Sequence, residues 1–121
     1  VLRGETEHGS VLLPGDIEAK AEGALIARSP SVLRSDVLLV PHHGGSASST
    51  PEFVAAVGAR EVVFSVGYRN AFKHPRPDVL ERYAASRHWC TDRDGALHIL
   101  LAGSIEVSAW RRERPRYWHG Q

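Results

Sequence analysis

Asp36-Val37-Leu38-Leu39-Val40-Pro41-His42-His43-Gly44-Gly45-Ser46 is the stretch that decides the fold, because an apolar run ends here in two histidines and two glycines. Four β-capable apolar residues stopped by a proline predict a short buried strand. The Pro-His-His-Gly-Gly sequence then forms a loop at the carboxyl end of that strand, where α/β proteins commonly place their chemistry. We therefore expect a functional site at this loop.

A second stretch, Ser10-Val11-Leu12-Leu13-Pro14-Gly15-Asp16, repeats the plan of a strand, a Pro-Gly break and a polar side chain. This repetition predicts that Asp16 and the two histidines lie at the ends of two neighbouring strands. Imidazole and carboxylate groups held on separate rigid elements are the ligands that zinc or manganese takes at hydrolytic sites. A helix predicted over residues 17–28 gives Asp16 a second interpretation, as an N-cap that stabilises the helix by about 1 kcal/mol.

The rest of the chain predicts alternating strands and helices, and therefore an α/β fold. Residues at helical spacing in the 17–28 segment are Ile17, Ala21, Ala24, Leu25 and Arg28. Thr50 as N-cap and Pro51 at the first position predict a helix to about Val57. The other expected elements are an edge strand at 1–7 with a turn at 7–10, a strand at 61–66, a loop at 67–77 that contains His74, a helix at 78–86, and strands at 88–91, 96–101 and 104–110, the first two joined by an Asp94-Gly95 hairpin turn.

Length and composition limit the classes of protein that this chain can be. Its 121 residues, 42% of them hydrophobic and 24% charged, predict one soluble globular domain. The formal net charge of +1 predicts no strong bulk attraction to nucleic acid or to anionic membranes, so any such affinity must be local. No apolar run reaches the roughly 18 residues of a membrane span, and a single cysteine, Cys90, excludes an internal disulfide and a cysteine-based zinc cluster.

The remaining histidines and the chain end have ordinary structural interpretations. His8 falls in the predicted turn, while His88 and His98 fall in predicted strands, as sheet-surface or satisfied interior residues. Basic and aromatic residues are interleaved at 111–118, a pattern that can bind phosphate and stack on bases, but at a chain end we expect a solvated, partly disordered tail. We therefore divide the chain into a domain at 1–110 and a tail at 111–121.

Four motifs, taken together and in this order, resemble the C-terminal metallo-β-lactamase-type domain of ComEC/Rec2 competence proteins. They are LLPGDIE at 12–18, SDVLLVPHHGGSASS at 35–49, FSVGYRNAFKHPRP at 64–77 and TDRDGA at 91–96. Members of this family are inner-membrane channel proteins for DNA uptake in natural transformation. The resemblance covers the chain up to about Leu101 and implies half of an αββα sandwich, with a mixed sheet and about two to three helices.

The resemblance also implies roles for individual residues. Asp16 would be the carboxylate that bridges two metal ions, and His42 a histidine ligand of the same zinc or manganese site. His43 and His74 would line the catalytic pocket, with His74 placed to contact substrate phosphate or to shuttle a proton. The chain departs from the family pattern at Gly45, where the family usually has serine, and at 72–73, where Tyr-Gly commonly precedes His-Pro.

What the resemblance implies for function is a metal-dependent phosphodiesterase or nuclease that acts on single-stranded or duplex DNA. This parent domain would be a soluble extramembrane part of a bacterial inner-membrane protein, joined to the membrane-embedded channel domain of the same chain. The early His-x-His-x-Asp-His cluster of such enzymes is absent from this sequence, which also opens at Val1 without a starting methionine. We therefore expect that this chain is the C-terminal half of the domain. Alone, this half is expected to bind no metal, to be inactive, and to self-associate through the sheet face left uncovered.

Two other interpretations stay open. The domain could be a non-catalytic module that binds DNA or a membrane partner, or a related hydrolase such as a phosphorylcholine esterase. A metal-binding H-x-[HD]-x-D-H cluster upstream of Val1 in the parent protein would favour the enzyme, and its absence would favour the binding module. Substrate profiling would separate the two hydrolases.

Overall fold

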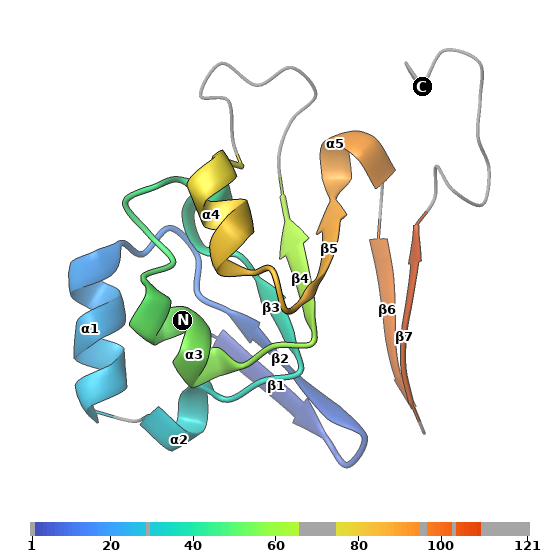
Figure 1. The fold of residues 1–121 in the computed structure, drawn as a ribbon. Helices are drawn as coiled ribbons and strands as arrows, with labels where there is room; N and C mark the ends of the chain where they lie inside the picture. The colour runs from blue at the N-terminus through green and yellow to red at the C-terminus, as the bar shows by residue number, and fades with distance from the viewer. Residues whose placement is uncertain (1, 29, 66–74, 95–96, 103, 110–121) are drawn as a thin grey trace.

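The structure, a computed structural model, describes residues 2–28, 30–65, 75–94, 97–102 and 104–109 (Figure 1). Five strands form one sheet in the order β1-β2-β3-β4-β5, and two more, β6 and β7, form a second. The strands are β1 (Leu2–Thr6), β2 (Gly9–Leu13), β3 (Val37–Leu39), β4 (Glu61–Phe64), β5 (Arg87–Cys90), β6 (Leu97–Ala102) and β7 (Ser104–Ala109). The helices are α1 (Ala19–Arg28), α2 (Pro30–Leu33), α3 (Pro51–Val57), α4 (Pro77–Arg82) and α5 (Thr91–Asp94), and a 3-10 turn, η1, covers Pro41–Gly44.

The large sheet is mixed, as predicted. β1 pairs antiparallel with β2, whereas β2, β3, β4 and β5 are parallel neighbours in chain order. β2 and β3 pair directly, with Val11 opposite Val37 and Leu12 opposite Leu38, so the two motif strands are neighbours. Their carboxyl ends, and those of β4 and β5, therefore meet at one edge of the sheet.

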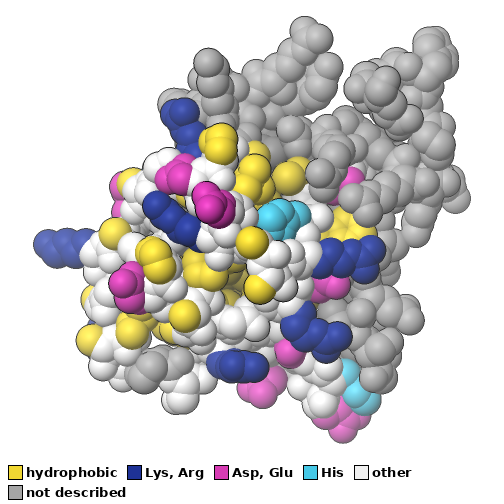
Figure 2. Space-filling view, in the orientation of Figure 1, with side chains coloured by type: hydrophobic (Ala, Val, Ile, Leu, Met, Phe, Trp, Pro, Cys, Tyr) yellow, Lys and Arg dark blue, Asp and Glu magenta, His cyan; other side chains and the backbone are white. Residues whose placement is uncertain are grey.

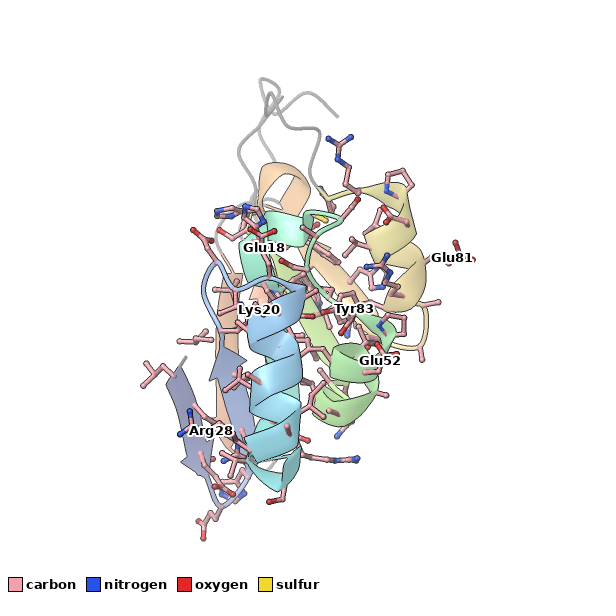
Figure 3. All side chains as sticks on the ribbon, turned by 90° about the vertical axis from the view of Figure 1, so that its left-hand side faces the viewer. Glu18, Lys20, Arg28, Glu52, Glu81 and Tyr83 are labelled. Carbon is pink, nitrogen blue, oxygen red and sulfur yellow. The ribbon has the colours of Figure 1, made fainter. Side chains whose placement is uncertain are left out.

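The helices form a single layer on one face of the large sheet. Because each parallel strand is joined to the next through a helix, α1, α3 and α4 all cover the same face, as Figures 1 and 3 show, while the β6–β7 hairpin stands on the other side (Figure 1). The core between sheet and helices is apolar and contains Leu12, Leu38, Val40, Val62, Phe64, Phe53, Val57, Val79 and Tyr83. Phe64 and Tyr83 meet edge to face, with ring centroids 6.0 Å apart.

α3 follows its sequence signals closely. The Thr50 hydroxyl accepts a hydrogen bond from the amide of Phe53 at 3.2 Å, and Pro51 occupies the first turn. The helix ends at Gly58, whose φ of +57° is a left-handed conformation that glycine adopts without a Cβ penalty. The predicted helix from Pro51 to Val57 is therefore confirmed.

α1 starts later than predicted and presents a different face. The helix begins at Ala19, so Asp16 lies upstream of the cap position and the N-cap interpretation of Asp16 is wrong. The residue buried on this helix is Glu22, and Leu25 and Ile26 pack at the edge of the core, while Ala21 is exposed. The helix is turned this way because the Glu22 carboxylate accepts hydrogen bonds from the loop before α3.

The predicted hairpin at Asp94-Gly95 is also wrong. β5 pairs with β4 in the large sheet, and β6 pairs with β7, so residues 88–91 and the strand after them do not form a hairpin. Instead Thr91–Asp94 forms the single turn α5, in which the buried Asp94 carboxylate accepts a hydrogen bond from the amide of Cys90 at 3.0 Å. Asp94 thus closes a local turn instead of starting a hairpin.

Other predictions have mixed outcomes. Three predicted helices correspond to α1, α3 and α4, whereas the single turns α2 and α5 have no counterpart in the sequence prediction. His8 is exposed in the β1–β2 turn, and the partly buried His88 ring nitrogen lies 2.6 Å from the carbonyl of Tyr83. The His98 side chain and the tail at 111–121 lie outside the described residues. Among the helices that the structure describes, none combines the length and the apolar character of a membrane span.

Candidate functional site at the carboxyl edge of the sheet

Backbone hydrogen bonds bring three sequence motifs together at the carboxyl edge of the sheet. The amide of His42 donates to the carbonyl of Gly15 at 3.0 Å, which joins the loop after β3 to the loop after β2. The amide of Arg76 donates to the carbonyl of Gly44 at 3.0 Å, which joins the same turn to the segment before α4. These contacts place Asp16 and the two histidines side by side, as the sequence predicts.

The histidine turn has an unusual backbone. His42 has φ 51° and ψ 40°, His43 has φ 56° and ψ 19°, and Gly44 has φ 86°. A left-handed conformation costs a non-glycine residue on the order of 1–3 kcal/mol and persists only where the surroundings enforce it. Strain of this kind concentrates at functional sites, so the turn itself marks this edge of the sheet as a candidate site.

Gly44 is required by its neighbours as well as by its φ angle. A Cβ added at this position would lie 2.6 Å from Cβ of Pro75, 2.9 Å from Cα of Pro75 and 3.1 Å from the ring of Phe64. No larger residue fits without moving the backbone at Pro75. The close approach keeps the histidine turn directly against the segment that follows His74 in the sequence.

His43 is oriented by a backbone carbonyl and faces Asp16. Its Nδ1 lies 2.7 Å from the carbonyl oxygen of Ser65, and its Nε2 lies 3.7 Å from Oδ1 of Asp16. A carbonyl oxygen can only accept, so Nδ1 carries the proton and, in the neutral ring, Nε2 has the unprotonated lone pair. Histidine ligands of metals are commonly oriented by this type of second contact.

The two facing side chains are open to solvent. The side chain of Asp16 is 73% exposed and that of His43 is 53% exposed, so a ligand can reach both. Since α1 begins only at Ala19, the Asp16 carboxylate is not used as a helix cap. Both groups are therefore accessible from the same side.

His42 is the histidine of the turn that also lines a cavity. It is partly buried, its Nδ1 atom is buried, and it lines a cavity of about 530 Å³. The other residues that line this cavity are Gly45, Ser46, Ala47, Arg76, Pro77 and Asp78. The cavity extends from the histidine turn toward α4. His74, the fourth predicted site residue, lies outside the described residues.

The donor atoms suit the metal that the family resemblance implies. A carboxylate and two imidazoles at one sheet edge are the ligand types that zinc and manganese take at hydrolytic sites. In the part of the chain that the structure describes, no group of three or more His, Cys, Asp and Glu side chains is placed to hold a metal ion. Asp16, His42 and His43 bring side chains of these types to one edge of the sheet.

A buried polar cluster lies beneath the loop that follows the histidine turn. The Glu22 carboxylate, fully buried on α1, accepts hydrogen bonds from the amides of Ser49 at 2.6 Å and Thr50 at 2.9 Å. Tyr83 donates its hydroxyl proton to Oγ of Ser49 at 2.8 Å, and Arg82 donates to the Ser49 carbonyl at 3.2 Å. Burial raises the pKa of the Tyr83 phenol, which therefore stays protonated as a donor. Figure 3 shows Tyr83 among α1, α3 and α4.

Sequence reasoning did not find three parts of this arrangement. The carbonyl of Ser65, which orients His43, is a backbone group and has no side-chain signature. Glu22 looks like a surface residue in an Ala- and Glu-rich helix, because its partners lie in a distant loop. Arg76 was only part of the His-Pro-Arg-Pro motif, and its place beside His42 depends on the fold.

Known proteins are similar to most of this chain. Competence protein ComA of Neisseria gonorrhoeae is 38% identical over 98% of this chain, which corresponds to 17% of its own length. ComE operon protein 3 of Bacillus subtilis is 32% identical over 87% of this chain and 14% of its own length. Recombination protein 2 of Haemophilus influenzae is 40% identical over 60% of this chain and 9% of its own length.

The chain thus spans less than a fifth of the length of these relatives. No family model matches the chain. No solved structure matches it.

Proposed function

Because the chain belongs to the ComEC/Rec2 family of competence proteins, we propose that it serves in DNA uptake during natural transformation. In this proposal it is an extramembrane part of a channel protein of the bacterial inner membrane. The names of the relatives support a role in competence, and the chemistry at the sheet edge supports a more specific role.

That specific role is phosphodiester hydrolysis on DNA by the intact parent domain. The observation that carries it is the geometry of the strained histidine turn, in which the Ser65 carbonyl orients His43 so that its Nε2 faces Asp16 at 3.7 Å. A structural histidine has no need of a left-handed backbone, an orienting carbonyl and an exposed carboxylate together. These features are those expected at a hydrolytic metal site.

Asp16 and His42 are the residues that would hold a divalent zinc or manganese ion. When bound, such an ion stabilises the negative charge that develops on the phosphate. His43 keeps one proton at Nδ1 on the Ser65 carbonyl, so Nε2 is the atom that accepts or releases a proton in the pocket. His74 is the further candidate to contact phosphate or to move a proton. The ligands that complete the site would come from the upstream part of the parent domain.

Substitution of Asp16 in the full-length protein tests the proposal. We expect Asp16→Ala to lower metal-dependent cleavage of a labelled oligonucleotide by at least about 100-fold, because the loss of a ligand weakens both metal binding and charge stabilisation. Glu18→Ala is the matched control, since Glu18 is an exposed carboxylate two residues further along and should cleave like the wild type. Undiminished cleavage by the Asp16→Ala protein would contradict the ligand role.

A further inference from the structure

Arg76 is a cation on the cavity wall whose guanidinium no described residue neutralises. Its backbone is fixed from both directions: its amide donates to Gly44, and its carbonyl accepts from Val79 and Leu80, both at 3.1 Å. Prolines precede and follow it, which restricts the backbone further. Among the described residues, the Arg76 guanidinium has no hydrogen bond or ion pair. The base of this side chain is therefore held against the histidine turn while its charged end is available.

Among the described residues that line the same cavity, the one carboxylate, that of Asp78, is already neutralised. Oδ1 of Asp78 accepts a hydrogen bond from the Ser46 hydroxyl at 3.0 Å, and Oδ2 lies 3.3 Å from the guanidinium of Arg82. Both oxygens of Asp78 are thus engaged with other groups. Within the described part of the chain, the cavity carries one uncompensated positive charge, at Arg76.

On a chain with little net charge, a single cation at a fixed position matters for the binding of phosphate. Figure 2 shows one face of the molecule, in the orientation of Figure 1. Over its described part, basic and acidic side chains are interspersed, with hydrophobic side chains among them. With a net charge of only +1, the chain offers no bulk attraction to a polyanion. Affinity for phosphate must therefore come from individual cations at fixed positions. An arginine fork matches phosphate oxygens in a bidentate manner.

We infer that Arg76 binds a phosphate group of the DNA backbone in the cavity beside His42. This inference rests on the proposed function. The volume of about 530 Å³ lies within the range of small-molecule sites and suits a nucleotide-sized group. Asp16 and His43 do not line the cavity, so the bound phosphate neighbours the reacting one. Arg76 then acts in substrate binding, and its contribution is the same in the ground state and the transition state.

The test uses the full-length protein and two arginine variants. We expect Arg76→Ala to weaken binding of a fluorescent oligothymidylate, measured by anisotropy in EDTA, by about 10- to 100-fold, which is the range for a charged hydrogen bond. The slope of log affinity against log salt should fall by about one, because one phosphate contact is lost. In cleavage assays KM should rise by a similar factor while kcat changes less than about threefold.

Arg28→Ala is the matched control, because Arg28 lies at the far end of α1 from the site (Figure 3) and its loss removes the same charge. Arg76→Lys retains the charge without the fork and should fall between Arg76→Ala and the wild type. Equal losses in Arg76→Ala and Arg28→Ala, or an Arg76→Ala protein that lowers kcat with KM unchanged, would overturn the inference. If the wild type cleaves DNA and the Arg76→Ala protein binds DNA normally, the inference is overturned and the proposed function stands. If the wild type neither binds nor cleaves DNA, the proposed function is overturned.

Discussion

At the scale of single residues, the site depends on a left-handed backbone conformation, which is unfavourable for histidine. His42 and His43 both have left-handed backbones, at a cost on the order of 1–3 kcal/mol each. The hydrogen bonds that offset this cost run from the amide of His42 and to the carbonyl of Gly44, and neither uses an imidazole. Variants that remove only an imidazole keep these two backbone hydrogen bonds, but a His43 variant also loses the contact with the Ser65 carbonyl.

Gly44 tests whether the turn is as closely packed as the structure describes. We expect Gly44→Ala to lower the free energy of unfolding by about 2–4 kcal/mol, since a Cβ there would meet Pro75 at 2.6 Å and φ is 86°. Gly23→Ala is the paired control, because Gly23 lies in α1 with nothing within 4 Å of an added Cβ. That change should stabilise the protein by up to about 1 kcal/mol. Urea denaturation measures both, and a Gly44→Ala protein as stable as the wild type would refute the close contact.

At the scale of elements, α1 shows what local sequence can and cannot predict. Helical spacing and an Ala- and Glu-rich composition predict that a helix exists there, and it does. They do not predict that Glu22 is its buried residue, because the amides of Ser49 and Thr50 that require a carboxylate lie in a different loop. α3 was predictable to its ends, since its cap, its proline and its terminal Gly58 are all adjacent in sequence.

Glu22 should be the most costly acidic side chain of α1 to remove. We expect Glu22→Ala to lower the free energy of unfolding by about 2–5 kcal/mol, because the buried amide of Ser49 and the partly buried amide of Thr50 lose their acceptor. Glu18→Ala, a change at an exposed position just before the same helix, should stay within about 0.5 kcal/mol of the wild type. Chemical denaturation followed by circular dichroism distinguishes them. Similar small effects of the two changes would show that Glu22 does not hold the loop.

At the scale of the whole molecule, the two faces of the large sheet are covered differently. The helices cover one face, whereas side chains of β2, β3 and β4 line a groove of about 210 Å³. Its apolar lining consists of Val11, Leu13, Val37, Leu39 and Val63. That these strands run parallel follows from sequence, because each strand alternates with a helix. The separation of β5 from β6 does not follow from sequence. The Asp-Gly signal for a hairpin is local, whereas β5 pairs with β4, which lies more than twenty residues away in the sequence.

The apolar groove makes the predicted self-association testable. We expect light scattering to show a mass that increases with concentration, because a second copy can cover the exposed part of this lining, such as Leu13. Leu13→Lys should reduce this increase, since Leu13 lines the groove and is 38% exposed. Val32→Lys is the control, as Val32 is an exposed residue of α2 on the helix side. A clean monomer at high concentration would count against self-association.

The hydrogen bonds that join Gly15 to His42 and Gly44 to Arg76 also determine when the site forms as the chain folds. Each bond connects segments that belong to successive strand–helix–strand units, so each closes a long loop of chain. Closing such loops costs entropy before the contacts repay it, and parallel pairing is accordingly slow. No local hairpin or single helix can hold Asp16, His42 and His43 together. The site therefore forms late, in the same cooperative step that docks β2 and β3 against the helices, and any opening that separates these strands disassembles it.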